Sequence, residues 1–591
     1  MMRIVFIAAL ALTAACNGGR EEEAPNADPD RAPTTDPTAG STDPAGADAG
    51  APGSPFPPEA LPALETISPD DMRAVVAEIS SDAYGGREPG TEGDEQARRY
   101  LAGRLEALGY APGAGDGYQQ PFDLIGITAA QPQRWTFHRG DDTRELEQRA
   151  EYIVGSGVQG ESAAIDDAEL VFVGYGIEAP EYQWDDFGDA DLEGKVLVML
   201  NNDPDWDPDL FEGERRLYYG RWGYKYESAA RQRAAGAIII HTSPSAGYPW
   251  QVVETSWSGT QFELPQGDEP GLQVKAWLTE EAARELVEWS GQDLDQLVEA
   301  ARSRDFEPVP LGVTTSITLD NELTRVQSAN VLGLLEGSDP ELSKEVVIYT
   351  AHHDHLGTDE DPRADDAIYN GALDNAAGMA VVLSIAEALT ALPERPRRSI
   401  LINFVGAEEQ GLLGSQYYAR NPTFPPGRIA ANLNFDGGAI WGETEDIGFI
   451  GMGKSDLDEV ARTVAGYQGR TLEGDQDPDK GYYYRSDQFS FASIGVPAIY
   501  PDAGRVVIGK PEGWGQEQMD AYTEHHYHQA SDELTDAWNF SGMVQEAEFG
   551  FLAGVLIANQ DDMPRWNPGD EFEAARQQAI EALDRPPEGR E

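Results

Sequence analysis

The sequence predicts an α/β protein in which an open, largely parallel sheet is interrupted by a smaller inserted domain. After residue 320, short apolar strands alternate with helices, and polar residues follow the strand ends. This order is typical of open α/β sheets, whose sites lie at the carboxyl edge. Between 155 and 315 the strands are short and no spacing of metal-binding residues occurs. The chain of 591 residues also exceeds one hydrophobic core, so several domains are expected.

The first sixteen residues have the pattern of a secretion signal. Arg3 is a short positive region, 4–12 is an apolar run too short to span a bilayer, and small residues lead to Cys16. Cys16 is the only cysteine, so no internal disulfide can form. It resembles the lipidation site of bacterial lipoproteins, although Thr13 stands where Leu is usual. We expect a membrane anchor through a lipid on Cys16, in the periplasm or at the outer membrane, with plain secretion as the alternative.

Composition divides the remainder of the chain. Residues 17–66 are rich in Ala, Pro, Gly and Asp, have almost no large apolar side chains up to about residue 60, and are predicted to form a disordered tether. The ordered part is predicted to comprise 67–154 and 316–565, with 155–315 inserted between them. The acidic tail at 566–591 is expected to be mobile or helical.

Local patterns predict the individual elements. Ser68 and Pro69 indicate the start of a helix that runs to Ile79, and 94–108 is a second amphipathic helix that ends at Gly109. Further strands are expected at 171–176, 195–200, 237–240, 345–350, 399–405, 429–435 and 496–500, with helices at 228–235 and 378–392.

Histidines and acidic residues are concentrated in a few segments. Six of the eight histidines fall in the windows 352–355 and 525–528. Histidine is the commonest metal-ligating side chain. Four acidic residues between the windows are further candidate metal ligands or catalytic groups: Asp374, Glu408, Glu409 and Asp436. Imidazoles and carboxylates from five segments suit two zinc ions better than one.

This set of side chains meets the needs of hydrolysis by a zinc pair. Such a site requires a bridging carboxylate, further imidazole and carboxylate ligands, and a bridging water molecule whose pKa both ions lower. One carboxylate that binds no metal must take the proton of that water and pass it to the leaving amine. The sequence therefore predicts a metallohydrolase.

The same residues lie in segments that resemble a known family. The segments are 351–357, 371–378, 407–415, 434–436, 485–489 and 527–532. Together they resemble the co-catalytic zinc aminopeptidases, family twenty-eight of the metallopeptidases, which includes bacterial leucyl aminopeptidases and glutamate carboxypeptidase. The resemblance implies a zinc-exopeptidase α/β/α sandwich with a mixed, largely parallel sheet. The insert at 155–315 is similar to the smaller, β-rich protease-associated domain of many such enzymes.

The resemblance implies five metal ligands. His352 and Asp436 would hold one Zn²⁺ ion, Glu409 and His528 would hold the other, and Asp374 would bridge the two. His528 is preferred to neighbouring histidines by the family spacing Tyr-His-x-x-x-Asp.

The resemblance also implies three catalytic residues. Glu408 would be the general base, and Asp354 would orient the ligand histidine or the catalytic site from behind. Tyr527 would polarise the substrate carbonyl. Because side chains alternate along a strand, His352 and Asp354 are expected on one side and His353 on the other.

Three functions are candidates for a chain with these residues. The first is an exopeptidase that removes N-terminal residues from peptide substrates. The second is a carboxypeptidase or other amide hydrolase on the same scaffold, for which the site segments offer few arginines beyond Arg485 and Arg505. The third, a non-catalytic binding protein, conflicts with the complete ligand set. A net charge of −63 argues against a nucleic-acid partner.

Overall fold

The computed structural model describes residues 55–58, 60–208, 210–267, 271–359 and 366–583. The expected signal peptide and its Cys16 lie outside these residues, as does the predicted tether up to residue 54.

The folded part begins before residue 67, whereas the sequence analysis expected it to begin at residue 67. Helix α1 (Ala60–Ala63) and the 3-10 turn Leu64–Thr66 precede the expected helix. Phe56 is buried in the main core with α1, and its ring lies 4.9 Å from that of Tyr467. The tether prediction is therefore wrong for the described residues between 55 and 66, because an aromatic ring and two buried alanines anchor this segment.

The first sheet is mixed, as predicted, and its central strands are parallel. Its order is β11 (Thr260–Glu263), β2 (Gln119–Ala129), β13 (Val309–Leu335), β15 (Ser399–Val405), β14 (Val346–His352), β16 (Ile429–Asn434), β19 (Ala498–Asp502), β17 (Asp446–Ile450) and β18 (Thr471–Glu473). The short β1 (Ala111–Pro112) pairs with β13. Strands β15, β14, β16 and β19 run parallel and correspond to the four strands expected after residue 320.

Helices cover both faces of this sheet. Helices α2 (Pro69–Ile79), α9 (Gly378–Ala391) and α14 (Ser541–Asn559) contribute to one core, and α10 (Leu413–Arg420) and α12 (Gln488–Ser493) to the other. Strand β14 contacts both cores through alternate side chains: Val347 and Tyr349 face the first, and Val346 and Ile348 the second. A strand buried on both faces reads as a continuous apolar run. The fold is thus the predicted layered α/β arrangement.

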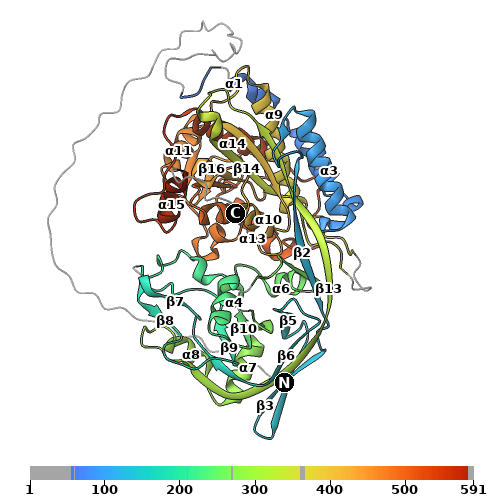
Figure 1. Ribbon diagram of the computed structural model, residues 1–591, viewed down its shortest axis with the longest axis vertical. Coiled ribbons are helices and arrows are strands. Elements are labelled where there is room, and N and C mark those ends of the chain that lie inside the picture. The colour runs from blue at the N-terminus through green and yellow to red at the C-terminus, as the bar shows by residue number, and fades with distance from the viewer. Residues whose placement is uncertain (1–54, 59, 209, 268–270, 360–365, 584–591) are drawn as a thin grey trace, which may run out of the picture. The chain divides into compact units, whose positions relative to one another are not determined.

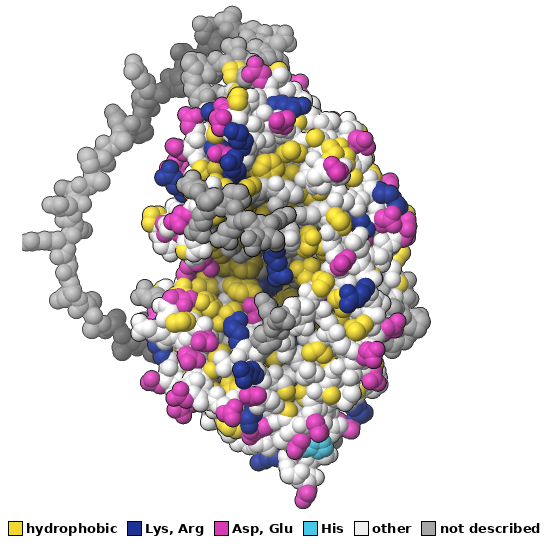
Figure 2. All heavy atoms as spheres, viewed as in Figure 1, with side chains coloured by type: hydrophobic (Ala, Val, Ile, Leu, Met, Phe, Trp, Pro, Cys, Tyr) yellow, Lys and Arg dark blue, Asp and Glu magenta, His cyan; other side chains and the backbone are white. Residues whose placement is uncertain are grey.

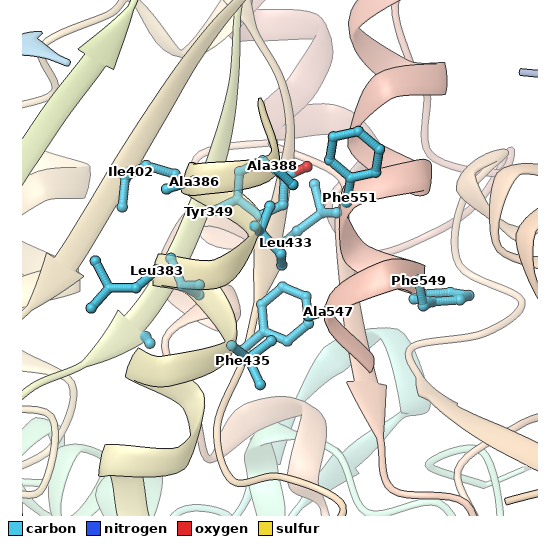
Figure 3. Close-up of a cluster of buried hydrophobic side chains, with 14 of the residues drawn as sticks. Tyr349, Leu383, Ala386, Ala388, Ile402, Leu433, Phe435, Ala547, Phe549 and Phe551 are labelled. Carbon is cyan, nitrogen blue, oxygen red and sulfur yellow. The ribbon is translucent and has the colours of Figure 1, made fainter. Parts of the chain in front are cut away.

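Figure 3 shows the first core, where Tyr349 and Phe435 lie between α9 and α14. Among the described residues, the helical stretch Ala372–Ala391 is the one that is long and apolar enough to cross a membrane. Within its most apolar window, 94% of the residues are buried inside the protein. This stretch is therefore a buried helix that packs in the core beside the first sheet.

The second sheet carries the insert. Its order is β4 (Asp142–Glu147), β3 (Arg134–Arg139), β13, β6 (Ser162–Phe172), β9 (Val196–Leu200), β10 (Gly236–His241), β12 (Val274–Thr279) and β5 (Tyr152–Ser156). Helix α4 (Trp222–Arg231) packs on one face, and α7 (Glu280–Ser290) and α8 (Leu294–Ala300) on the other.

The predicted boundaries of the insert, 155 and 315, do not coincide with this sheet. Strands β3, β4 and β5 precede residue 157, yet they hydrogen bond within the second sheet. The other boundary falls inside β13, which is one continuous strand that pairs with both sheets (Figure 1). Strands β3, β4 and β5 therefore belong with the insert, because a strand is part of the sheet with which it forms hydrogen bonds.

The C-terminal segment is helical where it is described. Helix α15 (Glu573–Leu583) follows Trp566 and Phe572, which are both buried. The guanidinium of Arg576 is buried and donates to the carbonyl of Ile429 at 2.9 Å. Of the two expected alternatives, helical is right for 573–583, and the residues from 584 onward lie outside the description.

Candidate metal centre

Three adjacent parallel strands lead into the candidate site. Strand β14 ends at His352, the glutamate pair Glu408–Glu409 follows β15, and Asp436 follows β16. The carboxyl ends of parallel strands meet at one edge of the sheet. The two remaining predicted ligands come from elsewhere: Asp374 lies in the turn before α9, and His528 follows helix α13 (Trp514–His525).

The structure brings all five predicted ligands together. The Nε2 atom of His352 lies 3.1 Å from Asp374 Oδ1 and 3.2 Å from Asp436 Oδ1. The Nε2 atom of His528 lies 3.3 Å from Asp374 Oδ2 and 3.0 Å from Glu409 Oε2. Each oxygen of Asp374 therefore faces a different histidine, which is the arrangement a bridging carboxylate requires.

The donor set fits zinc in both type and spacing. Tetrahedral zinc with bonds of about 2.0–2.1 Å places neighbouring ligand atoms about 3.3 Å apart. The four distances above, 3.0 to 3.3 Å, agree with that spacing. His352, Asp374 and Asp436 form one group whose ligand atoms all lie within 4.8 Å of one another. Imidazole nitrogen and carboxylate oxygen are ordinary zinc ligands.

Asp354 supports the glutamate pair. Its carboxylate oxygens accept hydrogen bonds from the backbone N–H groups of Glu408 at 2.9 Å and Glu409 at 3.2 Å. Its Oδ1 is 3.9 Å from His352 Nδ1, too far for a hydrogen bond. The expected contact with the ligand histidine is made instead by the Asp354 backbone oxygen, 3.3 Å from Nδ1. Asp354 therefore acts on the site mainly through the Glu408–Glu409 turn.

His355 is a site residue that sequence reasoning treated only as a neighbour of the ligands. It is fully buried, and its Nδ1 lies 2.6 Å from Glu409 Oε1, the oxygen not turned toward His528. With Asp374 and Glu409 it forms one of two further candidate donor groups; the other consists of His352, Glu408 and Glu409. The signal was present, because His355 belongs to the first histidine window.

The other histidines face away from the centre. His353 Nε2 lies 3.0 Å from the carbonyl oxygen of Ala329, on the opposite side from His352, as strand alternation predicts. His525 is exposed, and His526 Nδ1 lies 2.9 Å from Ser531 Oγ. Of the second window, only His528 reaches the carboxylates.

Two buried residues that the sequence analysis assigned no role fix the turn that carries Asp374. Asp532 accepts from the backbone N–H groups of Leu373 and Asp374, both at 3.0 Å. The fully buried guanidinium of Arg87 donates to the carbonyls of Asn370 at 2.6 Å and Gly371 at 3.0 Å. Asp532 lies in a segment that carries the resemblance and Arg87 does not, but the partners of both are backbone atoms, which no side-chain pattern reveals.

The concentrated carboxylates change the proton affinities of the site. Burial disfavours the charged imidazolium, but Glu409 and Asp374 outweigh it and raise the pKa of His528 to about 10. Burial also opposes ionisation of Glu409, yet His528 and His355 lower the pKa of its carboxyl to about 2. For Glu408, burial is the main cause of a pKa well above the ordinary value. The two adjacent glutamates thus have opposite electrostatic environments.

A cavity of about 560 Å³ adjoins the centre. Asp374, Glu408 and Asp436 line it from the first sheet, and Trp222 and Tyr248 line it from the insert. Figure 2 shows a hollow on one face, where hydrophobic side chains gather and basic side chains (dark blue) are seen.

Tyr527 faces this cavity beside the predicted ligand His528. The guanidinium of Arg485 donates to the Tyr527 hydroxyl at 3.2 Å and lies over the rings of Tyr248 and Tyr482, 5.1 Å from each centroid. Burial and nearby carboxylates raise the pKa of Tyr527, so its hydroxyl stays protonated. The phenol is therefore held as a hydrogen-bond donor at the cavity wall.

Comparison with known proteins agrees with the fold and the donor set. Residues 330–547 match the family model described as Peptidase family M28. The chain is 36% identical to mouse (Mus musculus) aminopeptidase NAALADL1 over 118 residues, which are 19% of this chain and 14% of that protein. It is 28% identical to leupeptin-inactivating enzyme 1 of Streptomyces exfoliatus over 177 residues, 29% of this chain and 39% of the relative. The matches thus span well under half of these relatives.

Among solved structures, the aminopeptidase from Aneurinibacillus sp. strain AM-1 superimposes with a TM-score of 0.50 and 18% identity, covering 85% of this chain and 97% of that one. This likeness shows a shared fold.

The chain therefore has an α/β fold like that of a solved aminopeptidase, with a donor set that could hold metal ions. More specifically, residues 330–547 match Peptidase family M28, and this match confirms the family resemblance.

Proposed function

We propose that this protein is a di-zinc exopeptidase that hydrolyses N-terminal residues from peptides. One observation carries the proposal: Asp374 turns one oxygen to His352 and the other to His528, with Glu408 beside them at the cavity. The names of the mouse and Aneurinibacillus proteins, both aminopeptidases, support the exopeptidase class.

Under this proposal His352 and Asp436 would hold one zinc, Glu409 and His528 would hold the other, and Asp374 would contribute to both. When bound, the ions would supply Lewis-acid chemistry, polarising the peptide carbonyl and lowering the pKa of water. The buried Asp374 carboxylate supplies charge to both positions and keeps them close together.

Glu408 is the proposed general base. Its backbone is fixed by Asp354, and its side chain is not among the atoms that face His528. Because burial favours the neutral carboxylic acid, Glu408 is suited to retain a proton taken from water and then to release it to the leaving amine.

Tyr527 is proposed to stabilise negative charge on the substrate carbonyl oxygen. Arg485 donates to the Tyr527 oxygen, which leaves the phenolic hydrogen free to point into the cavity. A preorganised donor of this kind costs no reorganisation when charge develops.

Metal removal tests the proposal. Treatment with a chelator should abolish hydrolysis of an unblocked peptide, and added zinc should restore it. Elemental analysis of the restored protein should give two ions per chain. A count of one, with full activity, would contradict the bridging role of Asp374.

A second candidate function, a carboxypeptidase, is favoured by two arginines at the cavity. Arg221, at the start of α4, lines the cavity together with Arg485. Burial and the nearby Arg485 charge lower the pKa of Arg221 to about 10. Among the described residues, Arg485 Nη1 is buried with no hydrogen-bond partner. Arg505, in contrast, is paired with Asp477. An anion placed between Arg221 and Arg485 would relieve their repulsion.

Blocked peptides separate the two candidates. An aminopeptidase requires a free α-amine, so N-acetylation should abolish cleavage while C-terminal amidation leaves it intact. A carboxypeptidase would give the opposite result. The ring of carboxylates around the metal positions favours the cationic amine.

We also propose that a lipid on Cys16 tethers the enzyme in the bacterial cell envelope. The lone cysteine after an apolar run and three small residues supports this proposal. Cys16→Ser should move the protein from the membrane fraction to the soluble fraction. Wild-type protein that is already soluble would favour plain secretion.

A further inference from the structure

The insert reaches the metal centre through one serine. Ser256 is the last residue of helix α6 (Trp250–Ser256), and its Oγ lies 2.7 Å from His528 Nδ1. The opposite ring nitrogen, Nε2, faces Asp374 and Glu409. Ser256 therefore holds the side of the imidazole that points away from the proposed metal position.

This contact lies at the ring nitrogen that would carry the proton when a metal occupies Nε2. An imidazole that binds a metal through Nε2 keeps its hydrogen on Nδ1, and that hydrogen is normally donated to a partner that fixes the ring. The Ser256 hydroxyl oxygen is placed to accept it. His528 is 7% exposed and has a left-handed backbone conformation with φ 57°, so the ring depends on neighbouring groups for its orientation.

A second contact from the same part of the insert reaches the residue next to the other ligand of this position. The backbone N–H of Phe262, in β11, donates to Gln410 Oε1 at 2.9 Å. Gln410 directly follows Glu409. The segment 250–263 thus contacts His528 directly and the Glu409 turn through the adjacent residue.

The other metal position differs in its support. His352 Nδ1 faces the backbone oxygen of Asp354 at 3.3 Å, within the first-sheet part of the chain. The Asn434 amide before Asp436 donates to Ser486 Oγ and Gln488 Oε1, both at 2.8 Å and again in that part of the chain.

We propose that Ser256 is a positioning residue for His528, and that segment 250–263 sets the affinity of the Glu409–His528 metal position separately from the His352–Asp436 position. The inference rests on the proposed two-zinc assignment. It makes the insert a structural component of one of the two metal positions.

The test is competitive metal binding on the full chain. Metal-free Ser256→Ala should bind one of its two zinc ions ten- to a hundred-fold more weakly than wild type, with the other unchanged, as for loss of a partner behind a ligand histidine. Ser256→Thr, which keeps the hydroxyl, should restore binding. Thr255→Ala is the matched control, because among the described residues Thr255 Oγ1 donates to backbone carbonyls of its own helix alone.

Stability of the metal-free protein separates positioning from folding. Ser256→Ala should have the melting temperature of the Thr255→Ala control without zinc, and a smaller rise than that control when zinc is added. Gln410→Ala provides a second variant and should weaken the same metal position.

Two results would overturn the inference: unchanged affinity at both positions in Ser256→Ala and Gln410→Ala, or equal weakening at both. Wild-type protein that binds fewer than two ions would instead overturn the proposed function.

Discussion

Two adjacent glutamates occupy different environments at the centre. Glu409 directs one oxygen to His528 at 3.0 Å and the other to His355 at 2.6 Å, so both of its oxygens face imidazoles. Glu408 instead adjoins Asp436, Glu409 and Asp487, whose charges add to burial in raising its pKa. One residue is therefore suited to bind metal and the other to exchange a proton.

This difference predicts opposite results for two single-atom changes. Glu408→Gln should lower kcat by about 10²–10⁴-fold, the usual contribution of a general acid–base group, while both zinc ions stay bound. Glu409→Gln should release zinc at lower chelator concentration. Steady-state kinetics together with metal analysis distinguish the two. Near-normal kcat in Glu408→Gln would contradict the assignment.

Glu546 supplies a prediction about pH. This buried glutamate accepts from the Ala439 N–H at 2.9 Å, and burial raises its pKa from 4.5 to about 7. Between those values the unfolded chain releases the proton while the folded protein keeps it, so stability is lost as pH rises through about 7. The total loss is about 3 kcal/mol.

Glu546→Gln should remove this loss. The variant keeps an oxygen acceptor but cannot ionise, so it should unfold at higher denaturant than wild type near pH 8 and by a smaller margin near pH 5.5. Urea unfolding of the metal-free proteins measures both. An equal margin at the two pH values would show that Glu546 titrates normally in the folded state.

The sequence could predict the metal donors better than their supports. His352, Asp374 and Asp436 follow recognisable strand or turn patterns, and the structure places them within hydrogen-bond distance. Arg87 and Arg221 act from distant segments, and each meets the site through folding across more than a hundred residues. Such contacts depend on tertiary packing, which local spacing does not encode.

At the scale of elements, apolar runs that end in polar residues were the reliable signal. Strands β14, β15 and β16 are buried throughout, and each leads into a site residue. Residues 134–154 were placed outside the insert because a local sequence pattern does not specify the partner of a strand. The structure shows that strands β3, β4 and β5 belong to the second sheet. The 27-residue strand β13 connects that sheet to the first one.

Close packing of α14 against β14 gives a prediction at this scale. A Cβ atom at Gly554 would lie 1.6 Å from the hydroxyl oxygen of Tyr349, a fully buried ring. Gly554→Ala should therefore lower the free energy of unfolding by about 1–3 kcal/mol, the usual cost of overpacking, despite the higher helix propensity of alanine.

Two further variants test this cause by denaturant unfolding. Gly103→Ala lies in α3 (Glu92–Ala107), where an added Cβ meets nothing within 4 Å, and should stabilise by up to about 1 kcal/mol. Adding Tyr349→Phe to Gly554→Ala should recover part of the loss, since the clashing oxygen is gone. Simple additivity of the two changes would exclude the clash as the cause.

At the scale of the whole molecule, the insert and the first-sheet part share one cavity and one hydrogen-bonded centre. Strand β11 comes from the inserted segment of the chain, yet it forms an edge of the first sheet beside β2. Ser256 precedes this strand and contacts His528. Phe262 lies in the strand and contacts Gln410. The insert is thus joined to the centre by covalent continuity, sheet pairing and side-chain contacts.

The net charge of −63 has a consequence for the entire chain. Like charges repel most strongly in the compact state, and the Debye length falls from about 30 Å at 0.01 M salt to about 10 Å at 0.1 M. The melting temperature of the metal-free protein should therefore rise by several degrees over this range of sodium chloride. Potassium chloride should act equally, because screening depends on ionic strength.

Exposed ion pairs such as Arg99–Glu92 weaken under the same conditions, but each contributes little. A melting temperature that stays flat or falls with salt would mean that these attractive pairs outweigh the net repulsion.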